Sequence, residues 1–169
     1  MSEIEYQKSS EQLKSESQNY LEQGQRQGYF VLDGQGIKYL PSGQRYDFSA
    51  PKERVRARFY FDLIEKYQYP PERIEFAVVV PDQIPERYAD IVVYKDSSRQ
   101  IPYMVIECRS AGIKAAEFKK AVVQAVIKAK ILEAKLAVCV AGQKQKIIKI
   151  EKQAEKIIKN LPVFYEKLN

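Results

Sequence analysis

Two carboxylates lie near corresponding ends of two neighbouring apolar segments. Asp90 is near the start of the segment 89–94, and Glu107 is near the end of the segment 102–109. The residues between them, 95–100, are polar and typical of a turn, so the two segments are predicted to form a β-hairpin. A hairpin brings the start of its first strand to the end of its second. The sequence therefore predicts that Asp90 and Glu107 meet.

Closing this hairpin symmetrically about Ser98 and Arg99 gives the expected pairs Tyr94 with Tyr103, Val92 with Val105 and Asp90 with Glu107. Opposed side chains have Cβ atoms about 5 Å apart. Two carboxylates at that distance repel each other unless a cation lies between them, and oxygen ligands suit Mg²⁺ or Mn²⁺. Strand alternation also places Arg109 on the face of Glu107. The alternative interpretation is a pair of strand-end acids that face solvent or are neutralised by Arg109.

The composition excludes several kinds of active site. The 169 residues contain no histidine, which removes Ser-His-Asp, Cys-His and histidine-metal mechanisms. The two cysteines, Cys108 and Cys139, lie in apolar runs and indicate small core residues in a reducing cytosol. No phosphate-binding G-x-x-x-x-G-K-[ST] loop is present, so neither a nucleotide-driven motor nor a small-molecule α/β site is favoured. Without a bilayer-length apolar run or a signal-peptide pattern, we expect a cytoplasmic protein with no membrane partner.

The length and an apolar content of 45% are those of one globular domain. We expect residues 1–28 to form a surface helix or a mobile tail and residues 29–169 to form that single domain. The predicted elements are a hairpin at 29–32 and 37–40, a helix from a Ser49 N-cap to Tyr69 ended by Pro70 and Pro71, a strand at 73–80, the central hairpin, a long helix at 115–134, a buried strand at 136–140, and at 145–150 either a strand or the start of a helix to 160.

The long helix carries two apolar stripes. The first faces the core and consists of Phe118, Ala121, Val122, Ala125, Ala129 and Leu132. The second, on the nearly opposite side, consists of Val123, Ile127 and Ile131. A helix that is apolar on both sides is usually covered by another segment or subunit, so homodimerisation through the second stripe is a hypothesis.

Positive charge is concentrated after the hairpin. The chain carries a net charge of +6, and residues 109–159 hold 13 basic and 4 acidic side chains. Such asymmetry is typical of a phosphate-backbone partner, and it is equally typical of a solvated lysine-rich helix face. If the partner is DNA, the candidate phosphate contacts are Lys114, Lys119, Lys120 and Lys128.

The order helix, strand, acidic hairpin, helix, buried strand resembles the PD-(D/E)XK nucleases, and in particular the N-terminal nuclease domain of type I restriction enzyme R subunits. The segments that carry the resemblance are Pro51-Lys52-Glu53-Arg54-Val55-Arg56, Tyr88-Ala89-Asp90-Ile91-Val92-Val93-Tyr94, Pro102-Tyr103-Met104-Val105-Ile106-Glu107-Cys108-Arg109, and Gln124 in the long helix. The resemblance spans residues 38–142. It implies an α/β fold with a restriction-endonuclease-like mixed central sheet flanked by helices.

The resemblance also implies a function and a set of site residues. The function is metal-dependent cleavage of DNA, without the motor domain of the R subunit and with restriction-modification subunits as further partners. Asp90 and Glu107 would bind Mg²⁺ or Mn²⁺ together with the main-chain carbonyl of Cys108. Glu53 would support a metal-bound water, and Gln124 would lie near the site. The alternative for Glu53 is a helix N-terminal acid that complements the helix dipole.

Two positions depart from the family pattern. The basic residue after Glu107 is normally a lysine and is Arg109 here, while the aromatic residue that commonly follows the glutamine by four positions is Lys128. Arginine stays protonated and cannot act as a base, although it can stabilise charge on a phosphate. The alternative function is therefore a catalytically inactive nuclease-fold module that binds DNA or assembles with other subunits.

Overall fold

The computed structural model of the protein describes residues 18–152 and 154–165. After a helical segment at 18–26 the elements are β1 (Phe30–Asp33), β2 (Gly36–Tyr39), β3 (Arg45–Asp47), α2 (Pro51–Glu65), the 3-10 helix η1 (Pro71–Arg73), β4 (Ile74–Val80), β5 (Arg87–Tyr94), β6 (Pro102–Arg109), α3 (Ala115–Ile131), β7 (Leu136–Ala141), β8 (Lys144–Ile150) and β9 (Glu155–Ile158).

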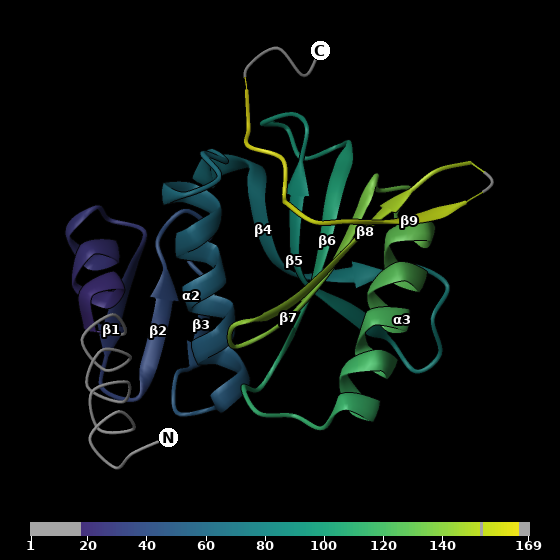
Figure 1. The fold of residues 1–169 in the computed structure, drawn as a ribbon. Coiled ribbons are helices and arrows are strands. Elements are labelled where there is room, and N and C mark those ends of the chain that lie inside the picture. The colour runs from purple at the N-terminus through teal and green to yellow at the C-terminus, as the bar shows by residue number, and fades with distance from the viewer. Residues whose placement is uncertain (1–17, 153, 166–169) are drawn as a thin grey trace.

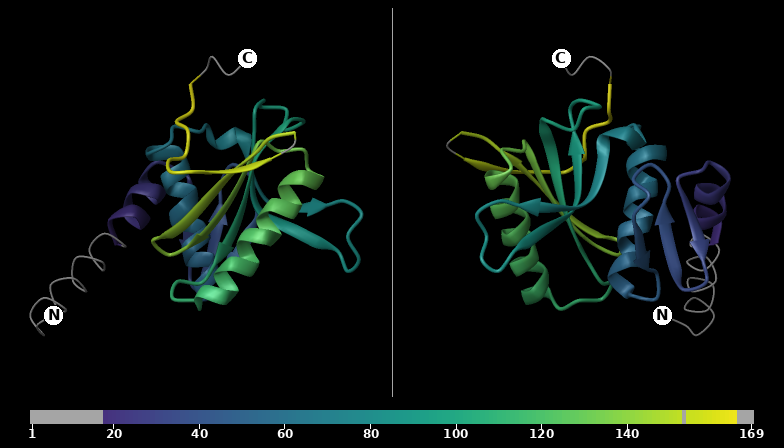
Figure 2. Two further views of the ribbon diagram at one scale, coloured as in Figure 1. Left: turned by 45° about the vertical axis from the view of Figure 1, so that its right-hand side comes forward. Right: turned by 180° about the vertical axis from the view of Figure 1, so that it is seen from behind.

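A six-stranded mixed sheet forms the centre of the molecule, in the order β4-β5-β6-β7-β8-β9 (Figure 1). Its one parallel pair among the described strands is β6 with β7, which α3 connects as a crossover. Strands β1, β2 and β3 form a separate antiparallel sheet beside α2. Helices α2 and α3 cover opposite faces of the central sheet, as Figure 2 shows from two further directions. This is the predicted mixed α/β fold, which is confirmed.

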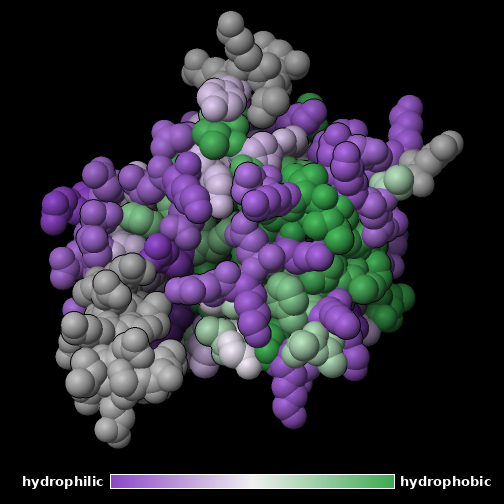
Figure 3. All heavy atoms as spheres, viewed as in Figure 1, coloured by the Kyte–Doolittle hydropathy of each residue, from purple (hydrophilic) through white to green (hydrophobic). Residues whose placement is uncertain are grey.

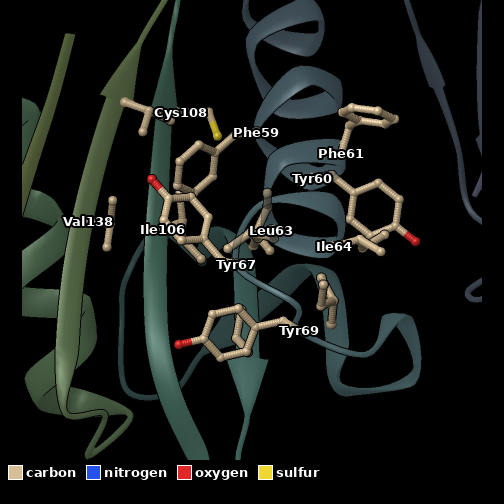
Figure 4. Packing of buried hydrophobic residues seen from close by; sticks show 14 of the residues in the cluster. Phe59, Tyr60, Phe61, Leu63, Ile64, Tyr67, Tyr69, Ile106, Cys108 and Val138 are labelled. Atoms are coloured by element: carbon tan, nitrogen blue, oxygen red, sulfur yellow. The ribbon is translucent and has the colours of Figure 1, made fainter. Parts of the chain in front are cut away.

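The face of the sheet under α2 is packed with large side chains. Phe59, Leu63 and Tyr67 of the α2 region meet Ile106 and alternate residues of the central strands (Figure 4). All four are buried. Because strand side chains alternate between faces, the same strands send their other apolar residues toward α3.

On the opposite face of the sheet, α3 packs mainly through small side chains. Ala121, Ala125 and Ala129 are buried against the sheet, beside residues such as Val92 and Val105. Alanine lets a helix approach the sheet closely, because little side-chain volume separates the two backbones. The second stripe points outward, with Val123 57% and Ile127 47% exposed and Ile131 half-buried. Figure 3 shows a hydrophobic area on the side of the molecule where α3 lies.

The ends of α2 differ from those predicted. Ala50 occupies the N-cap position without a side-chain hydrogen bond, and the hydroxyl of Ser49 donates to Asp47 instead, at 2.6 Å. The helix ends at Glu65 rather than Tyr69, because Gln68 has φ +62° and the N–H groups of Gln68 and Tyr69 turn back to the carbonyls of Ile64 and Leu63. A residue in the left-handed conformation just past the last turn, with N–H groups that return to carbonyls of that turn, ends a helix. The helix therefore stops before the two prolines are reached.

The hairpin of β5 and β6 is confirmed, with one correction to its register. Val92 pairs with Val105 as predicted, but a register shift after Val93 places Tyr94 opposite Pro102 rather than Tyr103. Proline has no N–H to donate to a strand ladder, so a regular pair is not available there. The bulge lies at the turn end of the hairpin and leaves the register unchanged where the acids lie.

Elsewhere the predictions for the chain are confirmed in part. The first hairpin is present as β1 and β2, and β3 was not predicted. Residues 145–150 form a strand, β8, and the alternative of a helix running to 160 is wrong, since β9 follows. The predicted tail or helix at 1–28 falls outside the described residues up to position 17, and positions 18–26 are helical. No described helix has the length and apolar character that crossing a bilayer requires.

Candidate active site

Asp90 lies near the middle of β5, at the level where that strand runs beside the last residues of β6. Ile91 pairs with Ile106, and the same register continued by one residue places Asp90 opposite Glu107. The Asp90 side chain is buried, with an exposed fraction of 8%. Its Oδ2 accepts a hydrogen bond of 2.8 Å from the main-chain N–H of Cys108, and its Oδ1 lies 2.5 Å from the ammonium of Lys52. Lys52 comes from the first turn of α2.

Glu107, near the end of β6, is bound by a different pair of cations. The guanidinium of Arg109 lies 2.8 Å from Oε1, and the ammonium of Lys128 lies 2.6 Å from Oε2. The Glu107 side chain is 2% exposed, so both contacts form where water has little access. The site thus contains two carboxylates and three cations from α2, β6 and α3.

The two carboxylates influence each other electrostatically. Burial raises the pKa of the Glu107 carboxyl, the negative charge of Asp90 raises it further, and Lys128 and Arg109 act in the opposite direction. A raised carboxyl pKa means that the ionised form is held at a free-energy cost. Additional positive charge between Asp90 and Glu107 would relieve that cost.

Arg109 and Gln124 are brought together, as their assignment to one site requires. The same terminal nitrogen of Arg109 that contacts Glu107 lies 2.5 Å from Oε1 of Gln124 in α3. The Arg109 side chain is 32% exposed, so its guanidinium is held by two partners and still faces solvent. Arg109 is therefore placed to meet an anion that arrives from outside.

Glu53 belongs to a second network of polar contacts, next to the one that surrounds Asp90 and Glu107. Its Oε1 accepts a hydrogen bond of 2.7 Å from the hydroxyl of Tyr39, and its Oε2 is bound by Arg56, with a distance of 2.9 Å from Nε. Arg56 in turn lies over the ring of Tyr46, 4.0 Å from its centroid. Burial raises the pKa of Tyr46, and the charges of Glu53 and Asp90 both add to that rise, so the phenol lies within electrostatic reach of both networks.

The remaining predicted site residues are more scattered. Lys114, Lys119 and Lys120 are exposed at the beginning of α3, whereas Lys128 is half-buried beside Glu107. The Cys108 thiol points into the core on the α2 side, and burial raises its pKa well above the ordinary value. Cys108 and Cys139 are both free and buried.

The donor set fits a small divalent cation of the magnesium type. Across the described ranges, no three acidic, histidine or cysteine side chains gather closely enough to form a metal cage. Mg²⁺ does not need one, since it is usually bound through one or two carboxylates together with waters and substrate phosphates. Asp90 and Glu107 are two carboxylates that repel each other, as a pair of oxygen donors for such a cation would. Lys52, the cation beside Asp90, has a side chain that is 40% exposed.

Three contributors to the site were not predicted. Lys52 lies within a segment that carries the family resemblance, but the resemblance implies a site role only for its neighbour Glu53. Tyr39 lies 14 residues before Glu53, and the carbonyl of Tyr88, which binds Lys128, lies 40 residues before it. No spacing signal links such residues, because the contacts depend on how α2, α3 and the strands pack. The proline before Lys52 and the acid after it were the available signals for a helix start whose side chains reach a strand end.

A mixed sheet with helices on both faces and two buried acids on adjoining strands is consistent with a nuclease-like α/β fold. A family model described as the N-terminus of the type I restriction enzyme R protein (HSDR_N) matches residues 51–162. This range is about two thirds of the chain and includes Asp90, Glu107, Arg109 and Gln124, and the protein belongs to that family. Comparison with curated proteins and with solved structures found no match.

Proposed function

We propose that the protein is a metal-dependent endonuclease that hydrolyses DNA phosphodiester bonds, within the restriction role to which its family is related. The observation that carries the proposal is the placement of Asp90 and Glu107. The two acids are buried on adjoining strands, and the charge of Asp90 contributes to the raised pKa of Glu107. Two buried acids placed against each other, with the pKa of one raised by the charge of the other, are typical of functional sites, and a bound cation would neutralise their repulsion.

Asp90 and Glu107 are the residues that would hold Mg²⁺ or Mn²⁺, with the main-chain carbonyl of Cys108 as a further oxygen. When bound, such a cation lowers the pKa of a coordinated water and polarises the phosphodiester. The N–H of Cys108 orients Asp90 by its hydrogen bond of 2.8 Å, and this bond remains available while the other oxygen of Asp90 changes partner. Lys52 would leave that oxygen for solvent.

The chain supplies positive charge for the phosphate. Arg109 is oriented by Gln124 and Glu107 and is partly exposed, so it can contact the phosphate oxygens and stabilise the charge that develops during hydrolysis. Both oxygens of Glu53 are engaged by Tyr39 and Arg56. We therefore assign Glu53 to fixing the first turns of α2, from which Lys52 reaches Asp90.

DNA and restriction-modification subunits are the partners that follow from the family. Lys114, Lys119 and Lys120 are exposed on α3 and would contact the DNA backbone without reading its sequence. Such binding weakens as salt concentration rises, because phosphate contacts release counterions. Duplex binding measured between low and high salt tests this basic face, and an affinity independent of salt would contradict it. Two free, buried cysteines agree with a cytoplasmic location.

A specific observation favours a second candidate function. Asp90 and Glu107 face three cations, Lys52, Arg109 and Lys128, so the site carries excess positive charge without a metal ion. A catalytically inactive nuclease-fold module that binds DNA would need only this positive charge to contact phosphates. The residue at position 109 distinguishes the endonuclease from the inactive module. A lysine there would restore the family pattern, whereas arginine departs from it.

Plasmid cleavage with Mg²⁺ and Mn²⁺ tests the proposal, using the wild type, Asp90→Ala and Arg109→Lys. The endonuclease proposal expects cleavage by the wild type that Asp90→Ala abolishes. Cleavage by Arg109→Lys alone would identify a silent descendant. If no variant cuts DNA and calorimetry detects no Mn²⁺ binding, the proposed metal site is wrong.

We propose separately that the protein forms homodimers through Val123, Ile127 and Ile131. Its support is the exposure of two of these side chains, which form an outward apolar stripe on α3. Light scattering at high protein concentration tests it, with Ile127→Lys as the variant that should dissociate a dimer. A monomeric mass for the wild type would contradict the proposal.

A further inference from the structure

Lys128 is placed differently from the other candidate lysines of α3. Its ammonium lies 2.6 Å from Oε2 of Glu107 and 2.8 Å from the main-chain carbonyl of Tyr88. Its side chain is 13% exposed, whereas Lys119 and Lys120 are exposed. Burying an ammonium is costly unless acceptors compensate for the lost water. Lys128 is therefore held in the site by contacts to both β5 and β6.

The geometry leaves Lys128 with bonding capacity. A lysine ammonium has three N–H donors, and the two hydrogen bonds described for Lys128 use two of them. The carbonyl of Tyr88 belongs to β5, two residues before Asp90, so the ammonium lies beside the strand that carries the second acid. The third donor is available for a phosphate oxygen.

The two departures from the family pattern meet on one carboxylate. Arg109 contacts Oε1 of Glu107, and Lys128 contacts Oε2. Arg109 is additionally bound to Gln124, which draws its guanidinium toward α3 and solvent. An ammonium from the helix thus shares Glu107 with a guanidinium from the strand, although Arg109 ends β6 and Lys128 lies in the last turn of α3.

We propose that Lys128 supplies the fixed ammonium of this site, holding Glu107 from α3 and contacting the scissile phosphate in place of a lysine at position 109. The inference rests on the proposed endonuclease activity, and it assigns Lys128 to the reaction rather than to general DNA binding. In this view the two departures from the family pattern are linked, because the lysine missing from position 109 of β6 is replaced by Lys128 of α3.

The test compares Lys128→Met and Lys128→Gln with the double variant Arg109→Lys/Lys128→Met in the full chain. Lys130→Met is the matched control, because it removes the same charge from the same helix at a side chain that pairs with Glu155, 2.5 Å away. Cleavage rate, Mn²⁺ affinity by calorimetry and thermal unfolding are measured for each. Lys128→Gln keeps a hydrogen-bond donor near Glu107 and covers the case in which Lys128→Met folds poorly.

Both single variants are expected to cleave about 100-fold more slowly, the usual effect of removing one donor that stabilises a developing negative charge. Their Mn²⁺ affinity should not weaken, because removing Lys128 frees an oxygen of Glu107. The double variant should regain at least about tenfold in rate, since residues in one salt-bridge network couple strongly. Lys130→Met should behave as the wild type.

Three outcomes would overturn the inference while leaving the endonuclease intact. These are wild-type rates in both Lys128 variants, loss of Mn²⁺ binding together with cleavage, and no recovery in the double variant. The second would show that Lys128 acts only by holding Glu107. A wild type that binds Mn²⁺ but cuts no DNA would instead contradict the proposed function, and the inference with it.

Discussion

Glu53 and Glu107 are two buried glutamates, and each is bound to an arginine two or three residues later in the chain. Glu53 and Arg56 lie in one helix and are both enclosed, with side chains 5% and 8% exposed. Glu107 is equally buried, but its partners Arg109 and Lys128 reach it from two elements and are 32% and 13% exposed. The first pair faces the protein interior, and the second pair opens toward solvent.

This difference indicates what each glutamate can do. A fully enclosed ion pair cannot exchange partners without exposing a buried charge, so it contributes to structure. An acid whose cations are partly exposed can release one of them when a substrate or metal ion arrives. The comparison therefore supports the proposed division, in which Glu53 stabilises α2 and Glu107 takes part in the reaction, and four predictions test it.

The largest effect is expected from Glu107→Gln. We expect cleavage to fall at least about 10³-fold, because one cation ligand is lost and Lewis-acid stabilisation is worth several kcal/mol. Glutamine keeps one acceptor oxygen for Arg109 or Lys128, and both cations are partly exposed, so the unfolding free energy should fall less than in Glu53→Ala. Initial cleavage rates and urea denaturation measure the two quantities. A stable variant with full activity would remove Glu107 from the site.

Glu53→Ala should show the opposite pattern. It leaves Arg56 buried without its carboxylate, and breaking a buried pair from one side costs about 3–5 kcal/mol of unfolding free energy. Urea denaturation measures this loss. At temperatures where the variant remains folded, Mn²⁺ affinity should match the wild type. Weaker Mn²⁺ binding by the folded variant would indicate instead that Glu53 contributes to metal binding.

A smaller effect is expected from Tyr39→Phe, which removes the hydroxyl that donates to Glu53 at 2.7 Å. The ring and its packing are kept, and Arg56 still binds the carboxylate, so the loss should be about 1 kcal/mol. Denaturation of Tyr39→Phe and Glu53→Ala, singly and together, gives the coupling between them. Fully additive losses would show that the hydroxyl acts elsewhere.

The smallest effect concerns pH. Because burial and Asp90 raise the folded-state pKa of Glu107, folding favours its protonated form. The stability from this group is fully present below the unfolded-state pKa and is lost as pH rises through the raised folded-state pKa. The unfolding free energy of the metal-free wild type should therefore fall relative to Glu107→Gln over that range. Parallel pH profiles for the two proteins would contradict the raised pKa.

The strands and the acidic pair were predictable because they depend on local pattern. Alternation in β5 and β6 fixes which residues share a face, and the polar turn fixes the pairing of Val92 with Val105. The exact ends of α2 were not predictable, since the left-handed conformation of Gln68 is not a typical glutamine preference. The mismatch of Tyr94 with Tyr103 has a local cause, Pro102, which could have been recognised.

The sequence by itself determined the mixed α/β class, the hairpin, the acids Asp90 and Glu107, and the family to which the chain belongs. Only the tertiary structure decided which cations meet those acids. Lys52, Arg109 and Lys128 come from α2, β6 and α3, and their convergence depends on helix packing on the two faces of one sheet. The alanines of α3 let that helix lie close to the strands. From this position Lys128 reaches Glu107.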